Sequence, residues 1–250
     1  MIDELRQHLT RLQKPAGLGD GPAALPLGIP AVDDVLGGGL FHGALHEIAA
    51  ASEAHLPAAA GFALGLATLP RDDKHLVWIA EDMALMENGS LYSAGLDAFG
   101  LSPQRLTGVS VAHRPELMWA MEEALRCRAV GAVIGEVRQG ALDAVAVRRL
   151  SLAASDSSAL AFLVRTQPSH GASTAMTRWI VETAASDRKL VGQQLKFGAP
   201  HFAVHLTRNR RGPSASWILE WRNTDERFIL AAHAEPVAAP VRHRPNRKVA

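Results

Sequence analysis

Short apolar runs alternate along the chain with longer segments in which apolar positions recur every three or four residues. The short runs are typical of strands buried on both faces, and the longer segments are typical of helices packed against a sheet. This alternation predicts βαβ units, a mostly parallel sheet flanked by helices and therefore an α/β fold. The predicted strands are 44–48, 76–80, 106–111, 129–134 and 159–164, and the predicted helices are 57–69, 86–99, 116–127 and 141–154.

The pattern changes near the C-terminus. Two apolar segments, 202–207 and 217–221, flank a turn at 208–213 that is rich in Arg, Asn, Gly and Pro. Two strands joined by such a turn predict an antiparallel hairpin. After Ala232 the sequence is rich in Ala, Pro, Arg and His without apolar periodicity, so we expect a disordered basic tail at 233–250.

The N-terminus carries a separate amphipathic element. Ile2, Leu5, Leu9 and Leu12 form one apolar stripe, which predicts a short helix within residues 1–14. Such a stripe either covers the protein's own core or docks on a second copy or a partner. The Gly- and Pro-rich stretch 15–30 indicates a linker. We divide the chain into the helix at 1–14, a linker at 15–25, a core at 26–232 and the tail.

Composition narrows the function classes. The 250 residues contain 26 Lys and Arg against 25 Asp and Glu, so any affinity for nucleic acid must come from local clustering. A single cysteine, Cys127, excludes an internal disulfide and favours a reducing cytoplasm. No membrane span or secretory signal is expected. No Ser/His/Asp, Cys/His or metal-ligand constellation occurs, so we predict no catalytic, cofactor-binding or metal site.

Residues 25–50, LPLGIPAVDDVLGGGLFHGALHEIAA, resemble the entry to the ATPase core of RecA-type recombinases. The matching positions are Gly28-Ile29-Pro30, Asp33, the segment 36–40 and Glu47-Ile48, in the same order and spacing. In that family the first strand ends in Glu-Ile and a phosphate-binding loop follows at once. The resemblance therefore implies a RecA-like sheet, with the loop expected just after residue 48.

That loop is absent. A phosphate loop needs glycines whose backbone N–H groups surround the phosphates, a lysine and a hydroxyl for Mg²⁺. No glycine lies between Gly43 and Gly61, and no lysine or arginine lies between Lys14 and Arg71. Glu53 would repel a polyphosphate, and His55, which could bind an anion only when protonated, is more simply a surface histidine. We therefore predict no ATP binding.

Three acids fall near the family's remaining nucleotide-site positions. Glu136 follows the strand that carries the magnesium-positioning acid, and Glu81 or Asp82 follows the strand that carries the water-activating glutamate. Since the phosphate cradle is missing, we interpret all three as solvated residues at strand ends.

A RecA-like chain without a phosphate loop, ending in a strand-Arg-Asn-Arg-x-Gly-strand hairpin, resembles the ImuA family of bacterial inducible mutagenesis proteins. The residues that carry this resemblance are 204–212 and 217–221, together with 25–50. It implies a non-catalytic accessory role in SOS-induced, error-prone translesion synthesis. It also implies two partners, an inactive Y-family-like polymerase (ImuB) and an error-prone C-family polymerase. RecA, a second copy and single-stranded DNA are further candidate partners.

Two alternatives stay open. One is a RecA-like ATPase with an unusual phosphate loop, against which the missing lysine is the main evidence. The other is a cell-division inhibitor of the SulA type, also a degenerate RecA relative, which the chain length and the basic tail disfavour.

Any DNA contact is expected at local clusters of cations, with weak sequence preference because aromatic residues are not interleaved with them. Two clusters are candidates, and the loop 167–177, flanked by Arg165 and Arg178, ranks third. The candidates are the hairpin turn, with Arg208, Arg210 and Arg211, and the tail, with Arg242, Arg244, Arg247 and Lys248.

Overall fold

The computed structural model describes residues 24–89, 91–138, 140, 142–169, 171, 173–186, 188–191 and 194–232. The stripe formed by Ile2, Leu5, Leu9 and Leu12 lies outside the described residues, and so does the basic tail at 233–250. The helix at 1–14 and the disordered tail therefore stay predictions.

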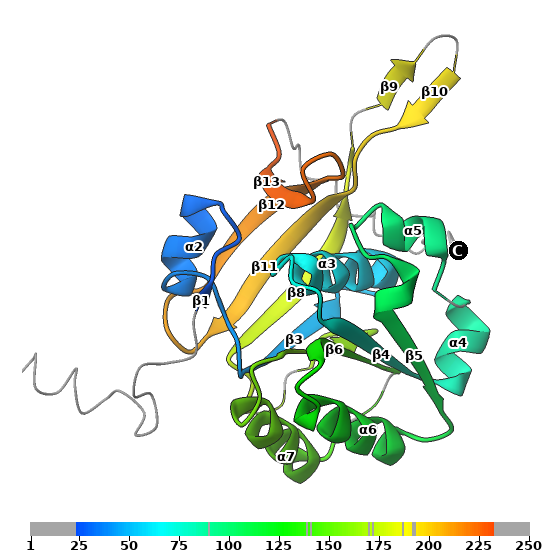
Figure 1. The fold of residues 1–250 in the computed structure, drawn as a ribbon. Coiled ribbons are helices and arrows are strands. Elements are labelled where there is room, and N and C mark those ends of the chain that lie inside the picture. The colour runs from blue at the N-terminus through cyan, green and yellow to red at the C-terminus, as the bar shows by residue number, and fades with distance from the viewer. Residues whose placement is uncertain are drawn as a thin grey trace, which may run out of the picture.

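A nine-stranded sheet runs through the molecule (Figure 1). Its strand order from edge to edge is β13-β12-β11-β8-β3-β7-β6-β4-β5. The strands from β8 to β5 are parallel, and those from β8 to β13 are antiparallel. The predicted α/β class is confirmed, and this arrangement is consistent with a RecA-like fold. The strands are β3 (Leu45–Ala50), β4 (His75–Glu81), β5 (Leu106–Val111), β6 (Val130–Val137), β7 (Leu160–Arg165), β8 (Thr177–Ala184), β11 (His201–Asn209), β12 (Ala215–Arg222) and β13 (Arg227–Leu230).

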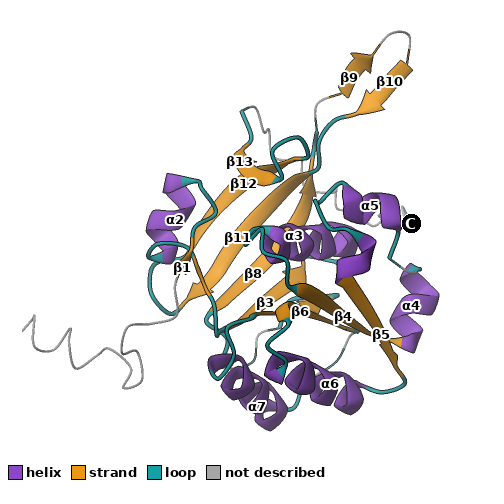
Figure 2. Ribbon diagram, viewed as in Figure 1, coloured by secondary structure: helices purple, strands orange, loops and turns teal. Residues whose placement is uncertain are grey.

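Helices cover the two faces of the sheet unequally (Figure 2). On one face, α3 packs against β3, β7, β8 and β6, and the core there is rich in aromatic residues such as Phe62, Trp179 and Trp221. On the other face, α6 and α7 cover a smaller aliphatic core. The helices are α2 (Pro30–Leu36), α3 (Leu56–Thr68), α4 (Asp82–Asn88), α5 (Ser93–Asp97), α6 (Arg114–Arg126) and α7 (Ala144–Ser155), with 3-10 turns η1 (Glu53–His55) and η2 (Pro103–Arg105).

The composition of α3 reflects its position over the middle strands of the sheet. Its residues are apolar nearly all round, as expected of a helix that is buried on most of its surface. Gly65 lets this helix approach the antiparallel strands, because a Cβ at this position would lie 2.5 Å from the ring of Phe228. By contrast, α6 and α7 each bury one stripe and expose charged residues on the opposite side.

Two predictions about connecting segments are wrong. The helix expected at 86–99 is two short helices, because α4 ends at Asn88 and the next residue, Gly89, adopts a φ of 81°. The linker expected up to Pro30 is structured from Ala24 onward, where β1 (Ala24–Leu25) pairs with β2 (Leu40–Phe41). The carboxylate of Asp33 accepts backbone hydrogen bonds from residues 27–29 and so fixes the entry to α2. Glycine and proline shape an ordered turn here.

The antiparallel hairpin is confirmed as β11 and β12, with Phe202 opposite Leu219. Three elements of this half were not predicted, namely β8, β13 and a small hairpin of β9 (Arg188–Val191) with β10 (Gln194–Phe197), which extends away from the sheet (Figure 1).

Among the described residues, no helix has the length and apolar character needed to span a bilayer.

Candidate functional site

The parallel strands bring polar residues to the carboxyl edge of the sheet. Arg165 at the end of β7 is level with Ala49 of β3 and with Val137 of β6. Two loops leave this edge, 138–143 after β6 and 166–176 after β7. Ligands of α/β sheets bind outside the carboxyl ends of the strands, so a nucleotide or DNA site should lie here.

The connection from β3 to α3 stands where a phosphate loop would lie. It consists of residues 51–55, and the last three of these form η1. His55 has a structural contact, because its Nδ1 accepts a 3.1 Å hydrogen bond from the backbone N–H of Thr183. Protonation of Nδ1 would remove this acceptor, so binding an anion through a charged His55 conflicts with the observed contact.

The interpretation of the three acids as solvated residues is wrong for two of them. Glu81 and Glu136 are only 8% and 9% exposed, because β4 and β6 extend far enough to include them as ladder residues. Glu81 accepts a 3.2 Å hydrogen bond from Nε of Arg114, so it forms an ion pair. Glu136 lines a cavity of about 400 Å³ between α3, β4 and α5. Asp82 is exposed and accepts a hydrogen bond from the Ser110 hydroxyl.

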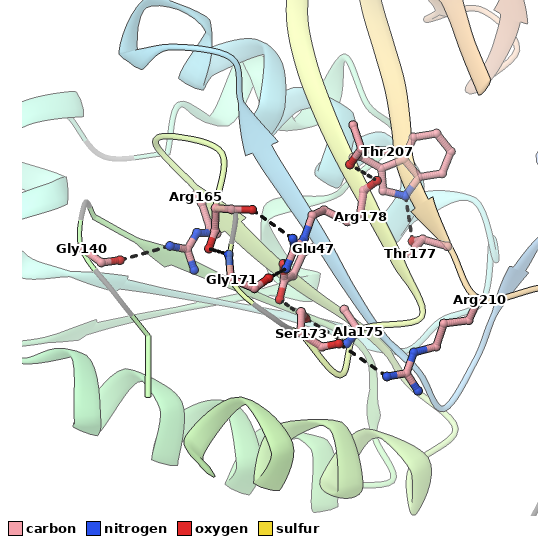
Figure 3. Close-up of polar contacts among 12 residues, drawn as sticks. Glu47, Gly140, Arg165, Gly171, Ser173, Ala175, Thr177, Arg178, Thr207 and Arg210 are labelled. Carbon is pink, nitrogen blue, oxygen red and sulfur yellow. Dashed lines mark hydrogen bonds and ion pairs between the residues drawn. The ribbon is translucent and has the colours of Figure 1, made fainter. Parts of the chain in front are cut away.

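A buried ion pair anchors the loop 166–176 (Figure 3). Oε2 of Glu47 on β3 accepts a 2.9 Å hydrogen bond from Nε of Arg178 on β8, its register partner. The other carboxylate oxygen, Oε1, accepts the hydroxyl proton of Ser173 in the loop. The remaining nitrogens of Arg178 donate to the carbonyl oxygens of Ser169 and Gly171, at 2.9 and 3.1 Å. One charge pair therefore fixes three points of the loop.

Beside this pair lies a second buried cation. Nη2 of Arg165 donates to the Gly140 carbonyl at 3.1 Å and so connects the two loops of the edge. Its Nε and the hydroxyl of Thr166 are buried without a hydrogen-bond partner among the described residues. Burial lowers the pKa of the Arg165 guanidinium, Glu47 opposes this, and Arg178 and Arg114 lower the pKa further. Arg165 and Thr166 line a polar pocket of about 240 Å³ together with Arg138.

The arginines of the hairpin turn have three different environments. Arg208 lines a cleft of about 620 Å³ together with Arg178, Pro168, Ser169 and Gly171. Arg210 is exposed and reaches the carbonyl oxygen of Ser173 at 3.5 Å. Arg211 lies over the ring of Phe41 at 4.0 Å, a cation–π contact that holds the turn to β2.

The structure thus joins two candidates that were ranked separately. Arg208 and Arg210 of the hairpin turn meet the loop 166–176, which is flanked by Arg165 and Arg178, while Arg211 points to another contact. Arg138 adds a further cation from the loop after β6. The Nε of Arg165 and the hydroxyl of Thr166, which have no hydrogen-bond partner among the described residues, suit the oxygens of an anion such as phosphate.

Sequence reasoning missed the central member of this site. Glu47 was used only as a matching strand residue, and its partner Arg178 lies 131 positions away. The available signal was an acid inside an otherwise apolar strand, because a buried carboxylate needs a partner.

No protein-family model matches the chain. Two curated proteins do, namely Protein ImuA from two strains of Caulobacter vibrioides, each 28% identical over 220 residues, which cover 82% of this chain and 86% of the relative. The chain is a homologue of ImuA. The similarity to ImuA extends well beyond residues 25–50 and the C-terminal hairpin, so it supports the family predicted from these two short motifs over most of the chain.

Proposed function

We propose that this ImuA homologue is a non-catalytic adaptor in damage-induced, error-prone translesion synthesis. The carrying observation is homology to ImuA in a chain whose phosphate-loop position, residues 51–55, has neither glycine nor lysine. Without a cradle for the phosphates, a RecA-like sheet can offer a rigid binding surface but no nucleotide-driven step. By family resemblance its partners are the inactive Y-family-like polymerase (ImuB) and the error-prone C-family polymerase.

The adaptor is expected to act independently of nucleotide. Isothermal titration with Mg-ATP should give no binding heat up to millimolar nucleotide, because residues 51–55 lack the required donors. Co-elution of the full chain with the two polymerases on size exclusion should be the same with and without Mg-ATP.

Either of two results would contradict the adaptor proposal and favour one of the alternatives. A micromolar dissociation constant together with ATP turnover would make the chain an ATPase with an unusual phosphate loop. Co-elution with a tubulin-like division protein, and with neither polymerase, would favour the SulA-type inhibitor. RecA carried through the same titration provides the positive control for nucleotide binding.

We further propose that the cleft between the hairpin turn and the loop 166–176 contacts the phosphates of single-stranded DNA. Arg208 lines this cleft, and Arg138 and Arg165 line the adjacent polar pocket, which shares Pro168 and Ser169 with it. Arg210 reaches the same loop at the carbonyl oxygen of Ser173. Among the described residues that line the cleft and this pocket, none has an aromatic side chain for base stacking. Contacts made by such arginines are to the backbone, so weak sequence preference is expected.

The salt dependence of binding separates the cleft from the tail. Each cation that neutralises a phosphate of a single strand contributes about 0.7 to the slope of log affinity against log salt. Arg208→Gln with Arg210→Gln should therefore reduce the slope by about 1.4 if both contact phosphates. Truncation after Ala232 should reduce it further if Arg242, Arg244, Arg247 and Lys248 also take part. Fluorescence anisotropy with a labelled single-stranded oligonucleotide across a salt series measures this slope for the unmodified chain, the double variant and the truncated chain.

Arg227→Gln is the matched control, because Arg227 is an exposed arginine on β13 that pairs with Asp225. Its slope should equal that of the unmodified chain. If the cleft double variant shows the same slope as this control, the cleft does not bind DNA. An unchanged slope after truncation would likewise remove the tail from the site.

A further inference from the structure

The outer surface of α6 and α7 carries an apolar groove that none of the other described elements covers. The two helices pack side by side on one face of the sheet (Figure 1), and between them lies a hollow of about 340 Å³. Trp119 and Met118 of α6 form one wall, and Ala146 and Arg149 of α7 form the other. Trp, Met and Arg are the residue types enriched in protein interfaces.

The residues beside this groove are unusually exposed for their type. Trp119, Val145 and Leu152 are 60%, 64% and 57% exposed, although each is a large apolar side chain. Val145, Arg149 and Leu152 follow one another at spacings of four and three, so they form a single stripe along the outside of α7. A stripe of this kind can pack against the apolar face of a second amphipathic helix.

The sequence predicts such a helix, at residues 1–14, within reach of the groove. The structure describes residues from Ala24, which pairs with Phe41, and the neighbouring His42 donates a 2.9 Å hydrogen bond to the carbonyl of Ser158, just beyond α7. Eleven residues separate Leu12 from Ala24, and an extended segment of that length spans roughly 35 Å. The whole of α7 is about 18 Å long.

We propose that the predicted N-terminal helix at 1–14 docks within the same molecule into the groove between α6 and α7. Its stripe, formed by Ile2, Leu5, Leu9 and Leu12, would cover the exposed apolar side chains. The tether leaves from the C-terminal end of α7, so Leu12 and Leu9 would lie beside Leu152, and Leu5 and Ile2 nearer Val145 and Trp119.

The groove carries cations that acidic residues of the segment can meet. Arg114 and Arg149 line it beside Glu122 and Asp143, and Asp3 and Glu4 lie at the N-terminal end of the segment. Arg149 uses Nη2 for Glu122 at 2.8 Å but its side chain is still largely exposed, so it can interact with a further carboxylate.

Disulfide trapping tests this arrangement in the full chain with Cys127→Ser. Leu9→Cys paired with Leu152→Cys should oxidise to an intramolecular disulfide. Gln7→Cys paired with Leu152→Cys is the matched control, because Gln7 lies on the opposite side of the predicted helix from the stripe. Since the tether is the same for both pairs, the Leu9 pair should form its disulfide about tenfold faster. Non-reducing gels distinguish monomeric from dimeric products.

A second measurement uses thiol accessibility. Deleting residues 1–14 from the Leu152→Cys protein should raise its rate of maleimide modification, whereas the rate at native Cys127, which is exposed, should not change. Equal disulfide rates for the Leu9 and Gln7 pairs, with no change in accessibility, would overturn the proposal. Disulfide-linked dimers would overturn it as well, because the segment would then dock on a second copy.

Discussion

Glu47→Gln should lower the free energy of unfolding by roughly 3–5 kcal/mol, the range seen when one partner of a buried ion pair is removed. The substitution leaves the largely buried guanidinium of Arg178 without its counter-charge. It also weakens the contact that holds Ser173 to β3. Urea unfolding monitored by circular dichroism measures this loss. Limited proteolysis should show earlier cleavage within 166–176, because the loop loses its charged anchor.

Two further variants separate the ion pair from general disturbance. Glu123→Gln removes the acid of an exposed ion pair on α6, and its effect should stay within about 0.5 kcal/mol. Glu47→Leu with Arg178→Met removes both buried charges and should recover much of the lost stability. If Glu47→Gln costs no more than Glu123→Gln, the pair does not hold the loop.

The central strands of the parallel half could be predicted from the sequence because they are buried on both faces. Such strands give nearly unbroken apolar runs, and β3, β4, β6 and β7 were found in this way. β8 was missed because its second face is only partly covered, so Arg178, Ile180 and Glu182 alternate with buried residues. This strand therefore lacks the unbroken apolar run by which the other strands were recognised.

The candidate site could be predicted only in part, for a related reason. The arginines of the hairpin turn and the loop after β7 were each recognised as local clusters. Their meeting depends on the register between β8 and β11, where Arg178 lies opposite Arg208 across a bulge. Register and bulges arise from tertiary packing, so a local pattern cannot reveal them.

The segment before α2 shows the limit of composition as a guide. Glycine and proline between 15 and 30 suggested a linker, yet Leu27 and Ile29 are buried in the aromatic-rich core. Gly28 adopts a φ of 78°, which places these two apolar residues inward within one tight turn. The glycine here is required by an ordered conformation.

Acidification should destabilise the protein through His46. This ring is fully buried, and burial lowers its pKa from 6.5 to about 4. Nε2 donates to the Phe41 carbonyl at 3.1 Å, so Nδ1 must accept the hydroxyl proton of Thr177 at 2.7 Å. That hydroxyl oxygen in turn accepts the indole N–H of Trp179 at 2.8 Å. The network requires a neutral ring, because a proton on Nδ1 would face the donor of Thr177.

The sign of the effect follows from which state binds the proton. The unfolded chain takes up a proton at His46 below about pH 6.5, whereas the folded state resists until about pH 4. Stability from the neutral ring is therefore fully present above pH 6.5 and is lost progressively as the pH falls to 4. The shift corresponds to roughly 3 kcal/mol over this window.

The measurement is urea unfolding between pH 4 and pH 7. The side chain of His46→Gln can still donate to the Phe41 carbonyl but does not titrate. The free energy of unfolding of this variant should therefore fall by roughly 3 kcal/mol less between pH 6.5 and pH 4 than that of the unmodified chain. His75→Gln replaces an exposed histidine at the start of β4 and should retain the slope of the unmodified chain. Parallel curves for the unmodified chain and His46→Gln would mean that His46 is protonated without loss in the folded state. The hydrogen-bond network from Phe41 to Trp179 would then have to rearrange with a charged ring at its centre.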